Sequence, residues 1–239
     1  MNKTKIEWTR GPNGESGYTW NPIKGLCPVD CKTPDGKSYC YARAMYKRFG
    51  WDPRLNLDKT PIDHYGRIPD GSRIFVCSTM EMFLHGGPSA YRSHIFKEIE
   101  DHPNLTFIIL TKRPENIDRP MPDNVWLGVS VTGGNQAAID RLAALYGATA
   151  RTKFVSIEPL LENPSPIFRD FMSTPPGRLD WAIVGRLTGH GAKYDPPPQW
   201  LGRLRVAFEF GGIPLFVKNN LAGIWPGPLI QEYPDCRAR

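Results

Sequence analysis

The chain has 239 residues, and its 30 lysines and arginines outnumber 24 aspartates and glutamates to give a formal net charge of +6. No apolar stretch approaches the roughly 20 residues that cross a bilayer, and the N-terminal Met1–Ile6 lacks the apolar segment of a signal peptide. These features argue against a membrane or secreted protein. We expect a cytoplasmic protein in which residues 1–239 form a single domain.

Apolar runs recur along the chain, and most are continuous rather than alternating, as in strands buried on both faces of a parallel sheet. Segments with helical spacing lie between these runs. The alternation predicts an α/β fold, either a doubly wound open sheet or a barrel. The predicted strands are Arg73–Ser78, Leu105–Thr111, Val125–Val131, Lys153–Ile157, Leu179–Val184 and Ile213–Val217, and the predicted helices are Ser89–Asp101, Gln136–Tyr146 and Gln199–Gly211.

Three cysteines, Cys27, Cys31 and Cys40, precede the first of these runs. Three thiolates can bind three irons of a [4Fe–4S] cube and leave the fourth iron open to a substrate or cofactor. A structural zinc normally takes four Cys or His ligands, and the nearest candidates are His64 and Cys77, the latter inside an apolar run. An odd total of five cysteines disfavours a disulfide. The spacing leaves a cluster, a zinc site and unliganded thiols open.

The same residues resemble the C-x3-C-x-aromatic-C motif of radical S-adenosylmethionine (radical SAM) enzymes. Cys27-Pro-Val-Asp-Cys31 matches the first half, and Tyr39-Cys40 matches the second. The family has two residues before its last cysteine, whereas this chain has eight, so Lys32–Ser38 is an insertion. Within it, Thr33-Pro-Asp-Gly36 is turn-forming and predicts a hairpin that returns Cys40 to the side of Cys31.

A narrower resemblance, to a phage and prophage family of radical SAM-like proteins of mostly unassigned function, covers most of the chain. One segment differs, because Gly185-Arg-Leu-Thr-Gly189 stands where that family would have Gly-Gly-Glu-Ser. The matching segments are Ile6-Glu-Trp-Thr, Trp20-Asn-Pro, Cys40-Tyr-Ala, Leu110-Thr-Lys-Arg-Pro114, Leu127-Gly-Val-Ser-Val131, Ser156-Ile-Glu-Pro-Leu-Leu161 and Phe216-Val-Lys218.

For the fold, the resemblance implies a partial (β/α) barrel of the radical SAM type, with about six parallel strands and a possible extra C-terminal strand. Tyr18–Ile23 would be the first strand, residues 25–41 the cluster loop, and Ala42–Arg48 the start of the first helix. In parallel barrels the carboxyl ends of the strands form the active-site face. Polar residues that follow the predicted strands would therefore converge on one cavity.

The resemblance also implies the cofactors, a [4Fe–4S] cluster held by Cys27, Cys31 and Cys40 and S-adenosyl-L-methionine, which together supply the radical chemistry. Glu81 would bind the methionine amino group, Lys112 or Arg113 its carboxylate, Ser130 and Glu158 the ribose, and Tyr41 the adenine. The full set of expected cofactor-binding residues is Tyr39, Tyr41, Ser78, Thr79, Glu81, Lys112, Ser130 and Glu158.

The expected reaction is hydrogen abstraction from a nucleotide or a DNA base by a 5′-deoxyadenosyl radical, in an isomerase or lyase that modifies phage DNA or repairs a lesion. An electron donor such as flavodoxin or ferredoxin would act as partner, in the host cytoplasm if the protein is phage-encoded. Two alternatives remain, a non-catalytic nucleic-acid-binding protein with a structural metal and a metabolic barrel enzyme with incidental cysteines. The expected substrate-binding residues are Trp20, Asn21, Arg113, Lys218 and Asn219.

Overall fold

The computed structural model describes residues 1–164 and 179–234. None of the helices in these ranges is long and apolar enough to cross a membrane. The strands are β1 (Asn2–Lys3), β2 (Tyr18–Trp20), β3 (Ile23–Lys24), β4 (Asn56–Leu57), β5 (Arg73–Val76), β6 (Thr106–Thr111), β7 (Val125–Val131), β8 (Thr152–Ile157), β9 (Trp181–Val184) and β10 (Leu215–Val217). The helices of the described ranges are α1 (Tyr41–Phe49), α2 (Ser89–Glu100), α3 (Gln136–Gly147) and α5 (Pro198–Phe210).

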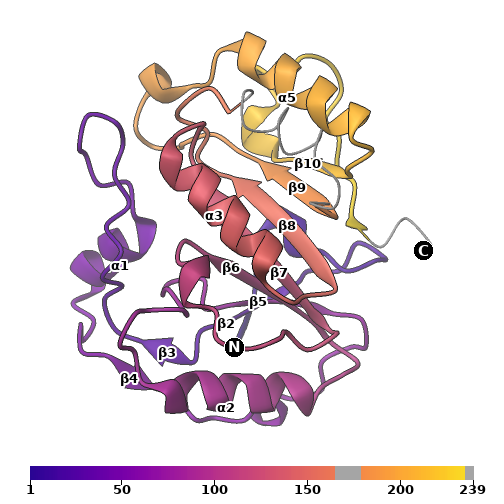
Figure 1. Cartoon of the computed structure of the whole chain (residues 1–239). Coiled ribbons are helices and arrows are strands. Elements are labelled where there is room, and N and C mark those ends of the chain that lie inside the picture. Colours follow the sequence, from indigo (N-terminus) through magenta and orange to yellow (C-terminus); the bar gives the residue numbers. More distant parts are fainter. Residues whose placement is uncertain (165–178, 235–239) are drawn as a thin grey trace.

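Eight strands form one sheet in the order β1-β2-β5-β6-β7-β8-β9-β10 (Figure 1). Every neighbouring pair from β2 to β10 is parallel, and only β1 runs antiparallel, at the edge beside β2. The predicted α/β architecture with a mostly parallel sheet is therefore confirmed. In the described residues β1 and β10 do not pair, so the sheet is open.

The first predicted strand, Tyr18–Ile23, is wrong in its length. β2 ends at Trp20, and Ile23 belongs to β3, which pairs antiparallel with β4 in a separate two-stranded sheet. Pro22 has no N–H group to continue the ladder. The chain therefore leaves the main sheet directly before the cysteine-containing loop.

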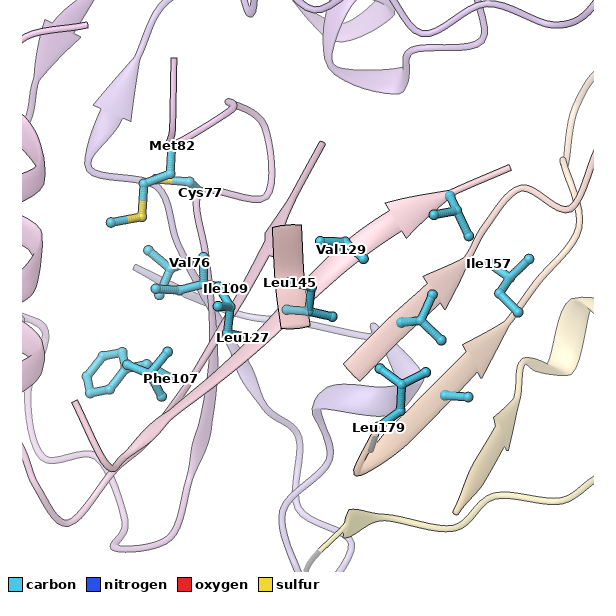
Figure 2. Close-up of a cluster of buried hydrophobic side chains, with 14 of the residues drawn as sticks. Val76, Cys77, Met82, Phe107, Ile109, Leu127, Val129, Leu145, Ile157 and Leu179 are labelled. Carbon is cyan, nitrogen blue, oxygen red and sulfur yellow. The ribbon is translucent and has the colours of Figure 1, made fainter. Parts of the chain in front are cut away.

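Helices α2, α3 and α5 cover one face of the sheet. Alternate strand residues such as Val76, Ile109 and Leu127 are buried in the same apolar cluster as residues from all three helices. Figure 2 shows part of this layer, in which Leu145 of α3 lies beside Leu127 and Val129. Burial of each such side chain contributes about 1.5–3 kcal/mol. The connections place these helices on a common side because parallel crossovers are right-handed.

The opposite face of the sheet is lined by aromatic side chains and is curved. Trp8 packs on Phe75 of β5 with ring centroids 4.8 Å apart, and on Trp181 of β9 at 6.5 Å. In a flat sheet these two strands would be about 19 Å apart, at about 4.8 Å per strand. Both can touch Trp8 only because the sheet bends around it. The second buried cluster on this concave face consists of Trp8, Phe75, Ile108, Trp126, Phe154, Trp181, Ile183 and Phe216.

Candidate cofactor site

The polar end of the concave face follows from the alternation of side chains along each strand. Ser130 lies on the same face as Trp126, and Glu158 and Lys218 continue the faces of Phe154 and Phe216. These polar residues stand at the carboxyl ends of β7, β8 and β10. The aromatic cluster therefore forms a floor, and the residues expected to bind ligands lie above it.

The cysteine-containing loop forms the predicted hairpin. Lys32 and Ser38 pair as an antiparallel bridge, and the Gly36 N–H donates to the Thr33 carbonyl at 2.8 Å. Gly36 has a φ of +82°, a conformation that glycine adopts without steric cost. Beyond the hairpin, the Tyr39 N–H donates to the Cys31 carbonyl at 2.9 Å. The inserted residues therefore return Cys40 to Cys31, as the turn chemistry predicted.

The three thiols act on one another electrostatically. A hydrogen bond from Cys31, together with the backbone N–H groups of Arg43 and Ala42 at the start of α1, lowers the pKa of Cys40 to about 6. The same hydrogen bond and burial raise the pKa of Cys31. Burial also raises the pKa of Cys27. Backbone hydrogen bonds from Glu81 and Val29 lower this pKa, but their effect is smaller. The donors to Cys40 therefore favour the thiolate form at this residue over that at the other two cysteines.

Residues 1–164 and 179–234 contain no group of three His, Cys, Asp or Glu side chains arranged to hold a metal ion. The thiols of Cys31 and Cys40 instead hydrogen-bond to each other. Three neighbouring thiols are nonetheless the donor set of a cube that lacks one protein ligand. Ligation by all three requires the Cys31–Cys40 hydrogen bond to break and the sulfurs to separate onto different irons.

Glu81 is a buried carboxylate beside the cysteines. Its Oε1 accepts hydrogen bonds from the Thr111 hydroxyl at 2.5 Å and the Phe83 N–H at 3.1 Å, and its Oε2 accepts from the Lys112 N–H at 2.8 Å. In the described ranges it forms no ion pair, although it is only 6% exposed. A carboxylate has about four acceptor positions, so one remains for an ammonium group.

The loop after β5 is held in a strained conformation. Cys77, directly after β5, has a φ of 55°, which is uncommon for a residue with a side chain. Its N–H donates to the Trp20 carbonyl at 2.8 Å. Non-glycine residues in this conformation concentrate at functional sites. The turn presents the next residues, Ser78 to Glu81, toward the cysteine-containing loop.

Asn21, Ser78 and Thr79 form one polar group at the ends of β2 and β5. The Asn21 Oδ1 accepts hydrogen bonds from the Ser78 hydroxyl at 3.1 Å and the Thr79 N–H at 3.3 Å. The Tyr41 hydroxyl donates to the Ser78 carbonyl, which ties the start of α1 to this group. The Tyr41 residue is 54% exposed. Its ring is therefore accessible to a planar ligand.

Lys218 and Glu158, expected to bind different molecules, form an ion pair with each other. A Cβ atom at Gly185 would lie 2.9 Å from the Lys218 side chain and 3.0 Å from that of Glu158, so glycine leaves room for the pair. The Ser130 hydroxyl lies 3.5 Å from the Glu158 carbonyl oxygen. The pair joins the carboxyl ends of β8 and β10.

Three expected site residues lie outside this group. Trp20 is 1% exposed and packs on Phe107 on the helix-covered face, so its ring is not available to stack on a substrate. Arg113 is half exposed and faces Glu115 at 3.6 Å. Asn219 donates its backbone N–H to Glu7 and accepts from Gln231 at 3.0 Å, on the outer surface. A fourth expected residue, Tyr39, lies beside Cys31. It is half-buried, and burial together with the charge of Cys31 raises the pKa of its hydroxyl.

From the sequence, Thr111 was placed only among the polar residues at strand ends, with no role of its own, and Arg141 was missed. Thr111 is 1% exposed and orients Glu81, and a hydroxyl ending a buried apolar run was the available signal. Arg141, on α3, donates to the Ser130 carbonyl at 2.9 Å, and burial lowers its pKa. Nothing in the local sequence marks Arg141, because a helical arginine is usually solvated.

The departure at Gly185–Gly189 has a structural explanation. Arg186, within this segment, donates two hydrogen bonds to the Asp195 carboxylate at 2.7 and 2.8 Å. The side chain of Asn220 donates to the Arg186 carbonyl at 3.1 Å. Arg186 therefore joins the start of the loop after β9 to Asp195 and to Asn220.

Comparison with known proteins gives a family and no function. No curated protein matches the chain, and no solved structure matches it. One sequence family, described as "Protein of unknown function (DUF5131)", matches residues 3–226. This range contains every residue of the candidate site and, apart from the first residue of β1, the ten strands of residues 1–164 and 179–234. The chain therefore belongs to the DUF5131 family.

Proposed function

We propose that this protein is a radical SAM enzyme that acts on a nucleotide or a DNA base. The observation that carries the proposal is the return of Cys40 to Cys31 across an inserted hairpin, at the carboxyl-end edge of a curved parallel sheet. The insertion would otherwise separate the last cysteine of the motif from the first two. In this proposal the open sheet is a partial barrel of the radical SAM type.

Cys27, Cys31 and Cys40 would hold a cube with one open iron, and with reduced flavodoxin or ferredoxin as electron donor this group would supply the one-electron reduction of S-adenosylmethionine. The protein's own residues bind and orient. The free acceptor position of Glu81 suits the methionine ammonium, and Lys112, whose charge acts on both Cys31 and Cys40, suits the carboxylate. The exposed ring of Tyr41 suits the adenine.

The Glu158–Lys218 pair has a different role from the one expected of either residue alone. A carboxylate and an ammonium that neutralise each other present little net charge to a ligand but retain further donor and acceptor positions. The ribose hydroxyls or a base edge can use these positions. The pair also lies over the aromatic floor, which excludes water from that side.

Anaerobic purification and reconstitution test the proposal. The wild-type protein should be brown, contain about four irons per chain, and release 5′-deoxyadenosine from S-adenosylmethionine when reduced. Cys31→Ala should lose the iron and the cleavage. Cys77→Ala, which removes a buried thiol of the helix-covered core, should retain both.

A colourless protein that binds zinc would contradict the proposal and favour a nucleic-acid-binding protein with a structural metal. Retention of colour and activity by Cys31→Ala would instead favour a metabolic enzyme in which the cysteines are incidental. Iron content and deoxyadenosine release together separate the three possibilities.

A further inference from the structure

The end of α1 presents aromatic side chains to solvent next to the cysteine-containing loop. Phe49 and Trp51 are 54% and 44% exposed, and their rings stack with centroids 5.4 Å apart and planes 21° apart. Gly50 between them adopts a left-handed conformation, with a φ of 61°, that turns the chain back. We call this stacked pair the aromatic platform. Burying two large rings elsewhere would have been favourable, so their exposure needs an explanation.

The platform lies in a basic part of the chain. Residues 43–67 contain six lysines or arginines and three aspartates, so these 25 residues carry a net +3 of the total +6. The Arg48 guanidinium lies over the Phe49 ring, 5.2 Å from its centroid. In the described ranges Lys47 and Arg48 form no ion pair, and both are exposed. These charges are free to meet phosphates.

Direct contacts connect the platform to the candidate cofactor site. The Trp51 ring packs edge-on against Tyr46 at 5.3 Å, and the Tyr46 hydroxyl accepts a hydrogen bond from the Gly25 N–H at 2.7 Å. Gly25 precedes Cys27 by two residues. Along α1, Tyr41 and Phe49 are eight residues or about 12 Å apart. When one base of a strand stacks on the platform, a nearby nucleotide of the same strand can therefore reach the candidate cofactor site.

We propose that the aromatic platform, with Lys47 and Arg48, binds single-stranded nucleic acid and delivers an adjacent base to the cofactor site. Exposed rings beside unpaired cations are the combination by which proteins hold single strands without sequence preference, because every base has a face to stack and every nucleotide a phosphate. The inference rests on the proposed function in taking a base as the substrate. It does not require the cofactors for binding itself.

Fluorescence anisotropy of labelled oligo(dT) and oligo(U) with the purified chain tests this inference. Stacking is worth about 1–3 kcal/mol per base, so Trp51→Ala and Phe49→Ala should each weaken binding by roughly tenfold. Phe210→Ala is the matched control, because Phe210 is 87% exposed at the end of another helix, α5. It should leave binding unchanged. The tighter of the two oligonucleotides identifies the natural strand.

Salt dependence tests the charges separately. Each phosphate contact contributes about 0.7 to the slope of log affinity against log salt for single strands, so Lys47→Ala and Arg48→Ala should each reduce the slope by about that amount. Equal affinities of wild type, Trp51→Ala and Phe49→Ala for the oligonucleotides would overturn the inference. It would also be overturned if the protein bound duplex more tightly than single strands and if the two substitutions left duplex binding unchanged. Thermal melting checks that the variants fold.

The two proposals can fail independently. Absence of iron with platform-dependent strand binding would reject the radical chemistry and keep the platform. Deoxyadenosine release with no platform-dependent binding would keep the chemistry and reject the platform.

Discussion

Glu81 shows how one residue acquires a role through neighbours that are distant in sequence. Its carboxylate is buried, and the donors that hold it come from Thr111 and Lys112 at the end of β6 and from Phe83. A glutamate is also favoured at a helix N-terminus, where its carboxylate is solvated. The hydrogen bonds remove that alternative, because no helix of the described ranges begins at Glu81.

We predict that Glu81→Gln lowers the free energy of unfolding by about 1–3 kcal/mol, because an amide turns N–H groups toward at least one of three donors and leaves a buried group unsatisfied. Urea denaturation measures the change. The control is Glu100→Gln, which breaks a surface ion pair with Arg119 and should cost no more than about 1 kcal/mol. Equal changes in the two variants would contradict a buried carboxylate at position 81 that accepts three hydrogen bonds.

The hairpin of residues 32–38 shows the same dependence at the scale of an element. Its turn-forming residues predicted a hairpin, and the Lys32–Ser38 bridge and the Gly36 conformation confirm that prediction. The hairpin matters because its two ends lie next to each other in the structure, which brings Cys40 close to Cys31. An element of seven residues thus substitutes for the short spacing of the motif that the cysteines resemble.

We predict opposite effects for two glycine substitutions. Gly36→Ala should destabilise the hairpin by about 1–2 kcal/mol, because a side chain is strained at a φ of +82°. Gly202→Ala, in the middle of α5 where a Cβ atom would meet nothing within 4 Å, should raise the unfolding free energy by about 0.5–1 kcal/mol, because alanine favours a helix. Urea denaturation measures both. Stabilisation by Gly36→Ala would mean that the hairpin does not form as described.

At the scale of the whole molecule, a polar contact joins the hairpin to the loop after β9. The Asp35 carboxylate accepts hydrogen bonds from the Thr33 hydroxyl at 2.6 Å, the Tyr194 hydroxyl at 2.6 Å and the Lys193 ammonium at 3.0 Å. These partners hold the pKa of Asp35 well below its usual value. The cysteine-containing loop is therefore fixed from a point 158 residues away in sequence.

A depressed pKa in the folded state means that this contact stabilises the protein above the ordinary aspartate pKa of about 3.9 and is lost only as the pH falls through the lower, folded-state value. We predict that NMR titration places the Asp35 midpoint below that of an ordinary aspartate. Tyr194→Phe should move it upward, because one donor to the carboxylate is removed. An unchanged midpoint in Tyr194→Phe would show that the contact is absent in solution.

The aromatic floor also acts on the molecule as a whole, because Trp8 packs on Phe75 and Trp181 from distant strands. We predict that Trp8→Ala lowers the unfolding free energy by about 3–5 kcal/mol, typical of a buried tryptophan, as measured by urea denaturation. Trp51→Ala, at the half-exposed platform, should cost much less. A small effect of Trp8→Ala would mean that the sheet curves without it.

The sequence by itself determined most strands of the main sheet and the helices α2, α3 and α5, because local rules suffice for them. Continuous apolar runs located β5 to β10 to within two residues at each end, helical spacing located α2, α3 and α5, and turn residues located the hairpin. Of the candidate site, the sequence marked the cysteines, Ser78, Thr79 and Glu81, because polar or reactive residues at strand ends and in loops stand out against an apolar pattern.

Only the tertiary structure decided which face each residue joined and which partner it met. Trp20 resembled a site residue by its place before the cysteines, but strand alternation turned it into the helix-covered core. Lys218 and Glu158 became an ion pair because curvature of the sheet brings the ends of β8 and β10 over one floor. Partners 60 residues apart leave no local signal, since packing, rather than sequence spacing, sets the distance between them.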